Sequence, residues 1–161
     1  MVARSEGLNH GSEFLVQLPR AGDGRPELAT EPSASAPLRR MRVLVVDDNR
    51  DSADSMRMLL DASGQDARCV YDGVSALEIA ESFRPEVVLL DIGMPSMDGY
   101  QVVRELRARN LAPRPVIAAL TGWGQDSDKK KTHEAGFDHH FTKPVAADAL
   151  MAFLEKAAAR S

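Results

Sequence analysis

One run of residues constrains the fold of this chain more than any other: the apolar stretch from Val87 to Leu90, which ends on Asp91. Four branched apolar residues in succession are typical of a strand buried on both faces, as in the middle of a parallel sheet. Pro95 follows soon after and lacks an amide donor, so the strand ends here. Open parallel sheets gather their loops at the carboxyl ends of the strands. We therefore expect Asp91 to stand in a crevice at such an end.

The same kind of pattern repeats from residue 41 onward. Apolar runs predict further strands at 43–46, 67–71, 116–120 and 137–141, and apolar residues at helical spacing fill the intervals and the segment after the last strand. Five strands that alternate with five helices predict an α/β fold, in which helices cover both faces of a parallel five-stranded sheet. About 120 residues suffice for one such domain.

Helix boundaries follow from capping residues and turn residues. Asp51 or Ser52 is expected to cap the first helix, and Gly64 to form its C-terminal turn. Asp72 and Asp98 are expected at the starts of the next two helices. The fourth helix, predicted over 126–135, has little apolar surface, so we expect it to pack weakly.

Composition narrows the function classes. A formal charge of −4 argues against a nucleic-acid surface, because phosphate contacts need a basic patch. Apolar residues make up 43% of the chain, yet no stretch approaches the roughly 20 consecutive apolar residues of a membrane-spanning helix. The single cysteine, Cys69, lies in an apolar stretch and is expected to pack there, as in a reducing compartment. We expect a cytoplasmic chain without membrane contact.

Residues 1–40 differ in composition from the rest. Residues 14–18 can form one strand, but a lone strand needs a partner edge for its backbone groups. Residues 20–40 are dominated by Pro, Gly, Ala, Ser and charged residues, a composition typical of a flexible linker.

Polar side chains stand at four of the predicted strand ends. Asp47 and Asp48 follow the first strand, Asp91 the third, Thr121 the fourth and Lys143 the fifth. Three carboxylates in one crevice repel one another unless a cation is present, and an all-oxygen site favours a hard ion such as Mg²⁺. The ammonium and the hydroxyl are suited to binding phosphoryl oxygens. The sequence therefore predicts a site for phosphoryl chemistry.

In these features the chain resembles the receiver domains of two-component response regulators, over residues 41–160. The resemblance rests on four motifs in the same order: Val43-Leu44-Val45-Val46-Asp47-Asp48-Asn49, Leu89-Leu90-Asp91-Ile92-Gly93-Met94-Pro95 with Asp98-Gly99, Ala119-Leu120-Thr121-Gly122, and Phe141-Thr142-Lys143-Pro144. It implies a flavodoxin-like, doubly wound (βα)5 three-layer sandwich.

The resemblance also implies the chemistry. Asp91 would be the nucleophile that accepts a phosphoryl group from a phosphohistidine and forms an acyl phosphate. Asp48 and Asp91 would hold Mg²⁺ through their side chains, and Gly93 through its backbone carbonyl. Asp47 would act on the metal mostly through water.

Further residues take roles by the same resemblance. Lys143 would pair with a phosphoryl oxygen, Thr121 would move to hydrogen-bond the phosphoryl group, and an inward swing of His140 would report that movement to the surface. Many relatives have tyrosine or phenylalanine at this last position. Simple packing or exposure is an equally good interpretation of His139 and His140. Trp123 either shapes access to the phosphoryl group or covers apolar surface.

Residues 1–19 resemble the final hairpin of a histidine kinase ATP-binding domain. With a linker over 20–40 and a receiver domain over 41–160, the chain resembles the C-terminal end of a hybrid histidine kinase. The implied partner is a histidine kinase or a histidine phosphotransfer protein. The chain lacks nucleotide-binding loops and a kinase histidine, so we expect no ATP-dependent kinase activity. Phosphoryl acceptance and autodephosphorylation are the reactions expected.

Three other functions were weighed. A hydrolase that forms an aspartyl phosphate from a small substrate places a second acid two residues after its nucleophile, but Gly93 stands at that place. A flavin- or nucleotide-binding domain needs a glycine-rich loop after the first strand, where Asp47 and Asp48 would repel an anion. A degenerate receiver that acts only as a binding module is the third alternative.

Overall fold

The computed structural model describes residues 2–4, 13–15, 39–122 and 126–159, which belong to two compact units, Met1–Ser35 and Ala36–Ser161. In the first unit, β1 (Val2–Arg4) pairs antiparallel with β2 (Glu13–Leu15). The remainder of the strand predicted at 14–18, and nearly all of the predicted linker, lie outside the described residues. The division of the chain at residues 19 and 40 stays a prediction.

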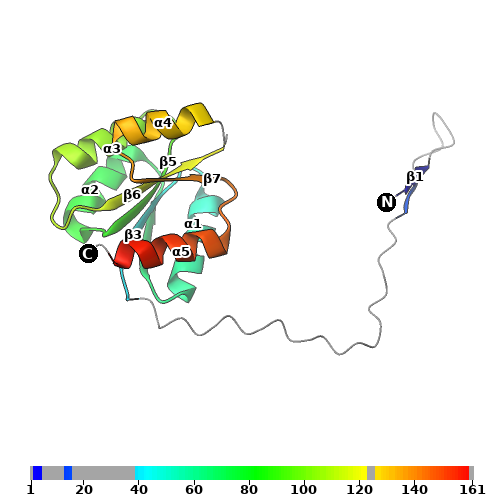
Figure 1. The fold of residues 1–161 in the computed structure, drawn as a ribbon, viewed down its shortest axis with the longest axis horizontal. Coiled ribbons are helices and arrows are strands. Elements are labelled where there is room, and N and C mark those ends of the chain that lie inside the picture. Colours follow the sequence, from blue (N-terminus) through cyan, green and yellow to red (C-terminus); the bar gives the residue numbers. More distant parts are fainter. Residues whose placement is uncertain (1, 5–12, 16–38, 123–125, 160–161) are drawn as a thin grey trace. The chain divides into compact units, whose positions relative to one another are not determined.

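The second unit contains one parallel sheet with the strand order β4-β3-β5-β6-β7 (Figure 1). Its strands are β3 (Arg42–Val46), β4 (Asp66–Val70), β5 (Val87–Asp91), β6 (Val116–Thr121) and β7 (His139–Thr142). The strand with the continuous apolar run, β5, lies in the centre and is buried at every residue. The order reverses between β3 and β5, and a doubly wound sheet opens its crevice at such a point.

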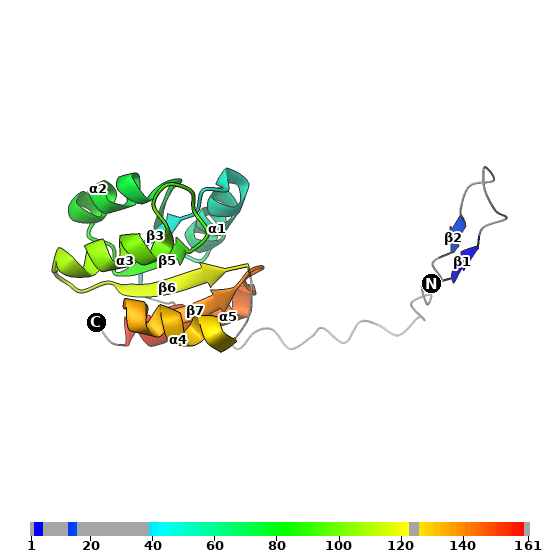
Figure 2. The same ribbon diagram turned by 90° about the horizontal axis from the view of Figure 1, so that it is seen from above.

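Helices cover both faces of the sheet, which confirms the predicted three-layer fold (Figures 1 and 2). One face packs against α1 (Arg50–Ala62) and α5 (Ala147–Ala158). The other packs against α2 (Gly73–Phe83), α3 (Gly99–Ala108) and α4 (Asp126–Ala135). None of the described helices is long and apolar enough to cross a bilayer.

Two apolar clusters form the core because successive strand residues point to opposite faces. Val43 and Val45 belong to the cluster under α1 and α5, whereas Leu44 and Val46 belong to the cluster under α2 and α3. All four side chains are fully buried, and burial of each contributes about 1.5–3 kcal/mol. This packing on both faces fixes the strands, and with them the side chains at the strand ends.

The predicted cap of α1 was wrong. Asn49 is the cap, and its side chain accepts a hydrogen bond from the Ser52 amide at 3.1 Å, while Asp51 lies in the first turn. Asn, Asp and Ser are similarly good capping residues, so a run of them does not reveal which one caps. The predicted starts at Asp72 and Asp98 are confirmed, and Asp98 forms a full capping box with Gln101.

Strands β3 and β6 are each one residue longer than predicted, and two other strands are shifted. Strand β4 spans 66–70 instead of 67–71, and β7 spans 139–142 instead of 137–141. Phe137 is buried without being part of the strand, because its amide donates to Thr132 O at 3.1 Å in the turn after α4 and its ring contacts Tyr100 edge-on. In the sequence, an apolar residue of this turn looks the same as an apolar residue of the strand that follows it.

Candidate functional site

The predicted polar residues converge at the carboxyl ends of the strands. Asp47 and Asp48 follow β3, Asp91 ends β5, Thr121 ends β6 and Lys143 follows β7. Carboxylate oxygens of the three aspartates lie within 4.8 Å of one another. Such closely spaced carboxylates fit a hard divalent cation, which accepts several oxygen ligands. The structure therefore brings together the residues that the sequence assigns to one crevice.

Lys143 links two of these carboxylates. Its Nζ lies 2.7 Å from Asp47 Oδ2 and 2.8 Å from Asp91 Oδ2. Burial of the Lys143 ammonium lowers its pKa, but the hydrogen bonds to Asp47 and Asp91 outweigh burial and raise the pKa of Lys143 above its ordinary value. The ammonium thus stays charged and supplies positive charge to the acidic crevice.

Asp47 is the most thoroughly enclosed of the acids. Its side chain is 1% exposed and accepts hydrogen bonds from the Asn49 amide at 3.0 Å and from Ser52 Oγ at 2.9 Å, besides the Lys143 ammonium. Asp48 is exposed. The Ser52 contact was not predicted, because Ser52 was considered only as a helix cap. The enclosure fits the expectation that Asp47 acts on a metal indirectly.

Asp91 is held at both carboxylate oxygens. Oδ1 accepts from the Gly93 amide at 3.0 Å, and Oδ2 receives Lys143. The loop after β5 then turns back, and the Gly99 amide donates to Ile92 O at 3.2 Å. A Cβ at Gly99 would lie 2.4 Å from Asp91 O, so only glycine permits this approach. Asp91 is 8% exposed, and its loop keeps it at the crevice floor.

Thr121 connects the site to β7. Its Oγ1 donates to Phe141 O at 3.3 Å, and its carbonyl accepts from the Lys143 amide at 2.7 Å. The peptide bond between Lys143 and Pro144 is cis. These contacts position the lysine and the threonine next to each other.

The two histidines of β7 point to opposite faces. The register pairs Ala119 with His140 and Thr121 with Thr142, so His140 lies on the same face as Thr121 and diagonally across from it. Both ring nitrogens of His140 are buried and have no hydrogen-bond partner among the described residues. This placement supports the predicted coupling of His140 to Thr121 without testing it.

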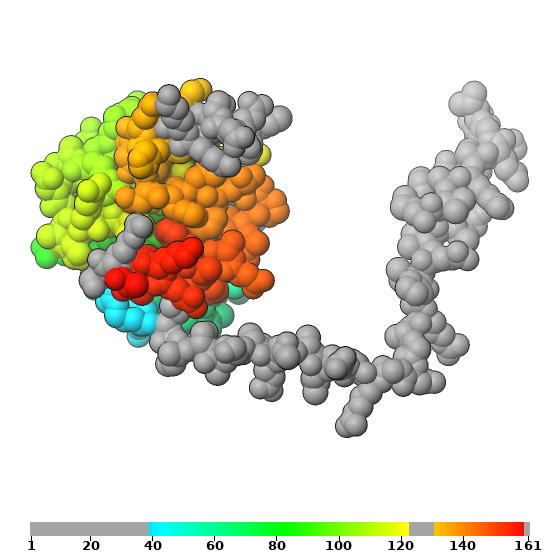
Figure 3. Space-filling view, in the orientation of Figure 1, coloured from blue at the N-terminus to red at the C-terminus, as the bar shows by residue number. Residues whose placement is uncertain are grey.

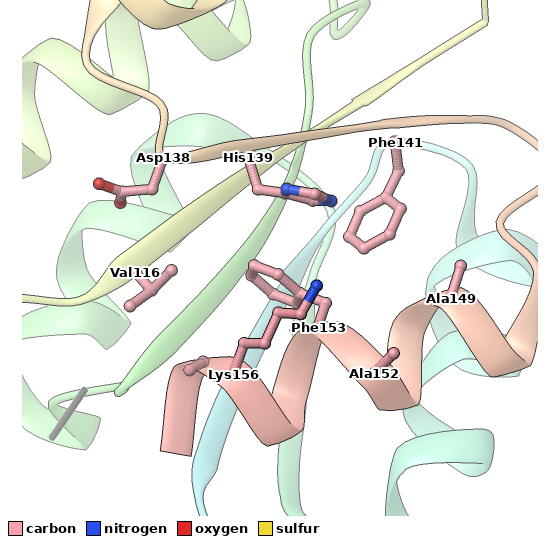
Figure 4. Close-up of a pocket in the computed structure, with 9 residues that line it drawn as sticks. Val116, Asp138, His139, Phe141, Ala149, Ala152, Phe153 and Lys156 are labelled. Carbon is pink, nitrogen blue, oxygen red and sulfur yellow. The ribbon is translucent and has the colours of Figure 1, made fainter. Parts of the chain in front are cut away.

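His139 lies on the α5 side of β7, in the face where α4, β7 and α5 are neighbours (Figures 3 and 4). Its ring stacks on Phe153 at 4.8 Å and contacts Phe141. Burial, together with the charges of His140 and Lys156, lowers the pKa of His139. His139, Phe141, Phe153 and Lys156 line an open cavity of about 360 Å³. His139 is thus an exposed residue of β7 whose ring packs on the aromatic side chains of Phe141 and Phe153.

A polar cluster beside the crevice was missed. Asp54 of α1 accepts hydrogen bonds from Tyr71 Oη at 3.1 Å and from Cys69 Sγ at 3.2 Å. The Arg50 guanidinium lies 4.2 Å from the centre of the Tyr71 ring. Cys69 is therefore a hydrogen-bonded thiol and not merely an apolar packing residue. Trp123 and its suggested role lie outside the described residues.

A doubly wound sheet whose strand ends carry clustered acids, a threonine and a lysine defines a signalling domain of the receiver type. Comparison with known proteins agrees: the model of the response regulator receiver domain family matches residues 43–155. This chain belongs to that family and is a receiver domain of two-component systems.

Three known proteins illustrate the similarity. The chain is 33% identical over 141 residues to the virulence sensor protein BvgS of Bordetella bronchiseptica, covering 84% of this chain but only 11% of BvgS. The receiver domain of sensor histidine kinase PA1611 from Pseudomonas aeruginosa, solved with a magnesium ion in its active-site cleft, is 29% identical with a TM-score of 0.68, covering 74% of this chain and 98% of that domain. The Saccharomyces cerevisiae Ssk1 receiver domain, crystallised with the phosphotransfer protein Ypd1, shares the fold at 21% identity with a TM-score of 0.70, covering 74% and 90%.

Proposed function

We propose that Asp91 accepts a phosphoryl group from a phosphohistidine. The observation that carries this proposal is the contact of the Lys143 ammonium, 2.8 Å from Asp91 Oδ2, within a cluster of three carboxylates. A cation fixed beside one acid of such a cluster can neutralise a phosphoryl oxygen that arrives on that acid. If Lys143 and Asp91 formed only a structural ion pair, the nearby carboxylates of Asp47 and Asp48 would serve no purpose and would add repulsion.

In the proposed transfer, a carboxylate oxygen of Asp91 attacks phosphorus while the bond between phosphorus and the imidazole nitrogen of the donor breaks. The donor leaves as histidine with the electron pair of that bond, and Asp91 becomes an acyl phosphate. Lys143 exchanges its contact with Asp91 Oδ2 for a contact with a phosphoryl oxygen. Thr121 Oγ1 exchanges its hydrogen bond to Phe141 O for a hydrogen bond to a second phosphoryl oxygen. Attack of water on phosphorus later releases phosphate and restores the carboxylate, which is the proposed autodephosphorylation.

The residues present fit a magnesium ion. Asp48 and Asp91 would hold it through side chains and Gly93 through its carbonyl, while Asp47, enclosed by Ser52 and Lys143, would act mostly through water. When bound, the ion supplies charge that offsets the oxygens of the transferring group. The recorded magnesium in the PA1611 receiver domain supports this assignment.

The proposed partner is a histidine kinase or a histidine phosphotransfer protein, in agreement with the Ssk1 complex. The partner would dock beside Lys143, where α1 and the segment after β7 border an open groove of about 500 Å³. Met56 and Leu59 of α1 line this groove, and the Leu59 side chain is 37% exposed; exposed apolar groups of this kind favour a protein partner. On phosphorylation, the surface around α4 and β7 would change through Thr121 and His140.

The wider context is also proposed. The pairing of β1 with β2 and the likeness to BvgS support a hybrid histidine kinase, in which residues 1–19 are the end of an ATP-binding domain and 20–40 a linker. The free thiol of Cys69 is compatible with the cytoplasmic location that we propose.

Intact mass spectrometry after incubation with acetyl phosphate tests the phosphoacceptor. We expect a gain of about 80 Da that requires Mg²⁺ and is absent in Asp91→Asn. Asp51→Asn is the matched control, because Asp51 is an exposed acid of the first turn of α1, and this variant should gain the same mass. If wild type gains no mass, releases no phosphate and does not respond to beryllofluoride, the chain is a degenerate receiver and the proposal fails.

A further inference from the structure

Helix α4 contributes few apolar contacts of its own. Its sequence is Asp-Ser-Asp-Lys-Lys-Lys-Thr-His-Glu-Ala. Among its described side chains, those of residues 131–135, Thr132 is buried and Ala135 packs partly against the core, while the other three are exposed. Apolar packing normally supplies most of the stability of a helix in a protein. Other contacts must therefore hold α4 in place.

The C-terminal end of α4 is fixed by backbone hydrogen bonds and a buried side chain. Gly136 has a left-handed backbone with φ of +107°. Its amide donates to His133 O at 3.1 Å, and the Phe137 amide donates to Thr132 O at 3.1 Å. These two bonds form a Schellman motif. The Phe137 side chain that follows is 3% exposed and anchors the turn in the core.

One side chain of α3 ties this turn to the sheet. The Arg107 guanidinium donates to Gly136 O from Nε at 3.0 Å and from Nη2 at 2.9 Å, and to Pro115 O from Nη1 at 2.8 Å. Nη2 also lies 2.6 Å from Asp138 Oδ2, which accepts the Ile117 amide at 2.8 Å. A single planar group thus joins α3, the start of β6 and the connection from α4 to β7, and bonds of this charge-assisted kind are the stronger ones.

The N-terminal end of α4 follows the phosphoryl site closely in the sequence. Asp126 follows Thr121 of the phosphoryl site by a short connection. Between α4 and β7 lies an open cavity of about 320 Å³, lined by Thr132, His133, Phe137, Asp138, His139 and His140. His140 is one of the lining residues, and its two ring nitrogens are buried without a hydrogen-bond partner in the part of the chain that the structure describes. This space is open to solvent, and the side chains of His133, Asp138 and His139 that border it are exposed, so tight packing against β7 does not hold α4 there.

We propose that Arg107 is a positioning residue that fixes the C-terminal end of α4 as a pivot about Gly136. Movement of α4 then increases toward Asp126, and the Arg107 contacts persist throughout. Because the near end follows Thr121, phosphorylation of Asp91 would turn α4 about this pivot. That last step rests on the proposed function, whereas the pivot itself does not.

Hydrogen exchange of the unphosphorylated full chain tests the pivot directly. We expect amide protection in wild type to rise along α4 from Asp126 to Gly136. In Arg107→Gln, amides from Gly136 to His139 should exchange at least about tenfold faster, since charge-assisted hydrogen bonds are lost and local opening is easier. Arg104→Gln is the control, because Arg104 is an exposed residue one turn earlier on α3, and should leave the profile unchanged. Arg107→Lys keeps the positive charge but loses the planar guanidinium with its several donors, so its exchange rates should lie between those of wild type and Arg107→Gln.

Beryllofluoride with Mg²⁺ tests the movement. In wild type the change in exchange should be concentrated in the first half of α4 and be small from Gly136 to Asp138. Uniform protection along α4, equal profiles for Arg107→Gln and Arg104→Gln, or an equally large response at Gly136 would each overturn the pivot. No response anywhere would contradict the phosphoacceptor function, and the unphosphorylated profiles would then decide the pivot alone. If Arg107→Gln does not fold, Asp138→Asn replaces it; this variant removes the negative charge opposite Arg107 and weakens the acceptor of the Ile117 amide, so a smaller increase is expected.

Discussion

At the scale of single residues, charge balance dominates the receiver site. Lys143 contacts Asp47 and Asp91 at once, and Asp47 is almost completely enclosed. A carboxylate in such surroundings is stable only with a cationic or hydrogen-bonding partner. The Lys143 ammonium and a bound divalent cation would therefore both neutralise the negative charge of these carboxylates.

Replacement of Lys143 by methionine should show whether a divalent cation can take over the neutralisation of these carboxylates. Without added metal, we expect the free energy of unfolding to fall by about 1–3 kcal/mol, because two carboxylates lose a charged partner. Saturating Mg²⁺ should narrow the difference from wild type, since bound ligands stabilise the folded state. Urea unfolding in EDTA and in Mg²⁺ measures both values. Lys156→Met, at an exposed position on α5, is the control, and equal stabilisation of Lys143→Met and wild type by Mg²⁺ would contradict the prediction.

Tyr71 offers a second test through pH. Hydrogen bonds to Cys69 and then to Asp54, with a smaller contribution from burial, raise the pKa of Tyr71 from 10.0 to about 12. The neutral phenol is thus favoured in the folded state, and its contribution to stability is complete below about pH 10 and lost as the pH rises toward 12.

The ultraviolet absorbance of tyrosinate follows this titration in a Tyr100→Phe background, since the chain has two tyrosines. Asp54→Asn should lower the midpoint toward 10.0, because the carboxylate acceptor is lost. A midpoint near 10 in the parent would show that the Tyr71 contacts are absent in solution.

At the scale of elements, the junction of β5 and α3 decides how Asp91 is presented. A Cβ at Gly99 would lie 2.4 Å from Asp91 O and 2.8 Å from Ile92 Cα, whereas a Cβ at Gly93 would meet Asp91 Oδ1 at an ordinary 3.8 Å. Both clashes at Gly99 involve backbone, which cannot rotate away. The two glycines therefore differ sharply in what they tolerate.

Gly99→Ala should consequently destabilise the protein by about 3 kcal/mol or more, as expected for overpacking against backbone. Gly93→Ala should change stability by less than about 1 kcal/mol, because the site has space and alanine restricts the unfolded chain. Thermal or urea unfolding measures both. Comparable losses in the two variants would show that the loop is not packed as described.

Elements were largely predictable from sequence because their signals are local. The buried run before Asp91 and the caps at Asp72 and Asp98 depend on neighbouring residues alone. The choice of Asn49 over Asp51 was not predictable, since several adjacent residues cap equally well. Phe137 was assigned to a strand because it is apolar and lies next to the strand residues. The sequence does not show that its ring packs against Tyr100, a residue distant in the chain.

At the scale of the whole molecule, the site could be predicted because its residues share one property, a place at a strand end. The network around Arg107 has no such property. Besides the Asp138 carboxylate, its acceptors are the backbone carbonyls of Pro115 and Gly136, and any sequence supplies backbone carbonyls. The contact of Asp54 with Tyr71 was missed for a similar reason, since it depends on how α1 lies against β4.

Removal of residues 1–35 should leave the receiver unit intact. Contacts divide the chain between Ser35 and Ala36, and both core clusters consist of residues from Met41 onward. We expect the melting temperature of the receiver transition to change by no more than about 1 °C, since distant, independent sites are additive. Calorimetry of the full and shortened chains checks this. A shift of several degrees would show that the first unit contributes to receiver stability.

The parallel sheet has a consequence for how this domain can be joined to others. Each strand starts at the pole opposite the crevice, and α5 runs back to that pole, where Val116 at the start of β6 and Ala157 near the end of α5 line the same cavity. Strand β3 therefore begins, and α5 ends, at the pole opposite the carboxyl ends of the strands. Such a unit can be inserted into, or appended to, chains of quite different architecture while its reactive face stays open to an incoming donor.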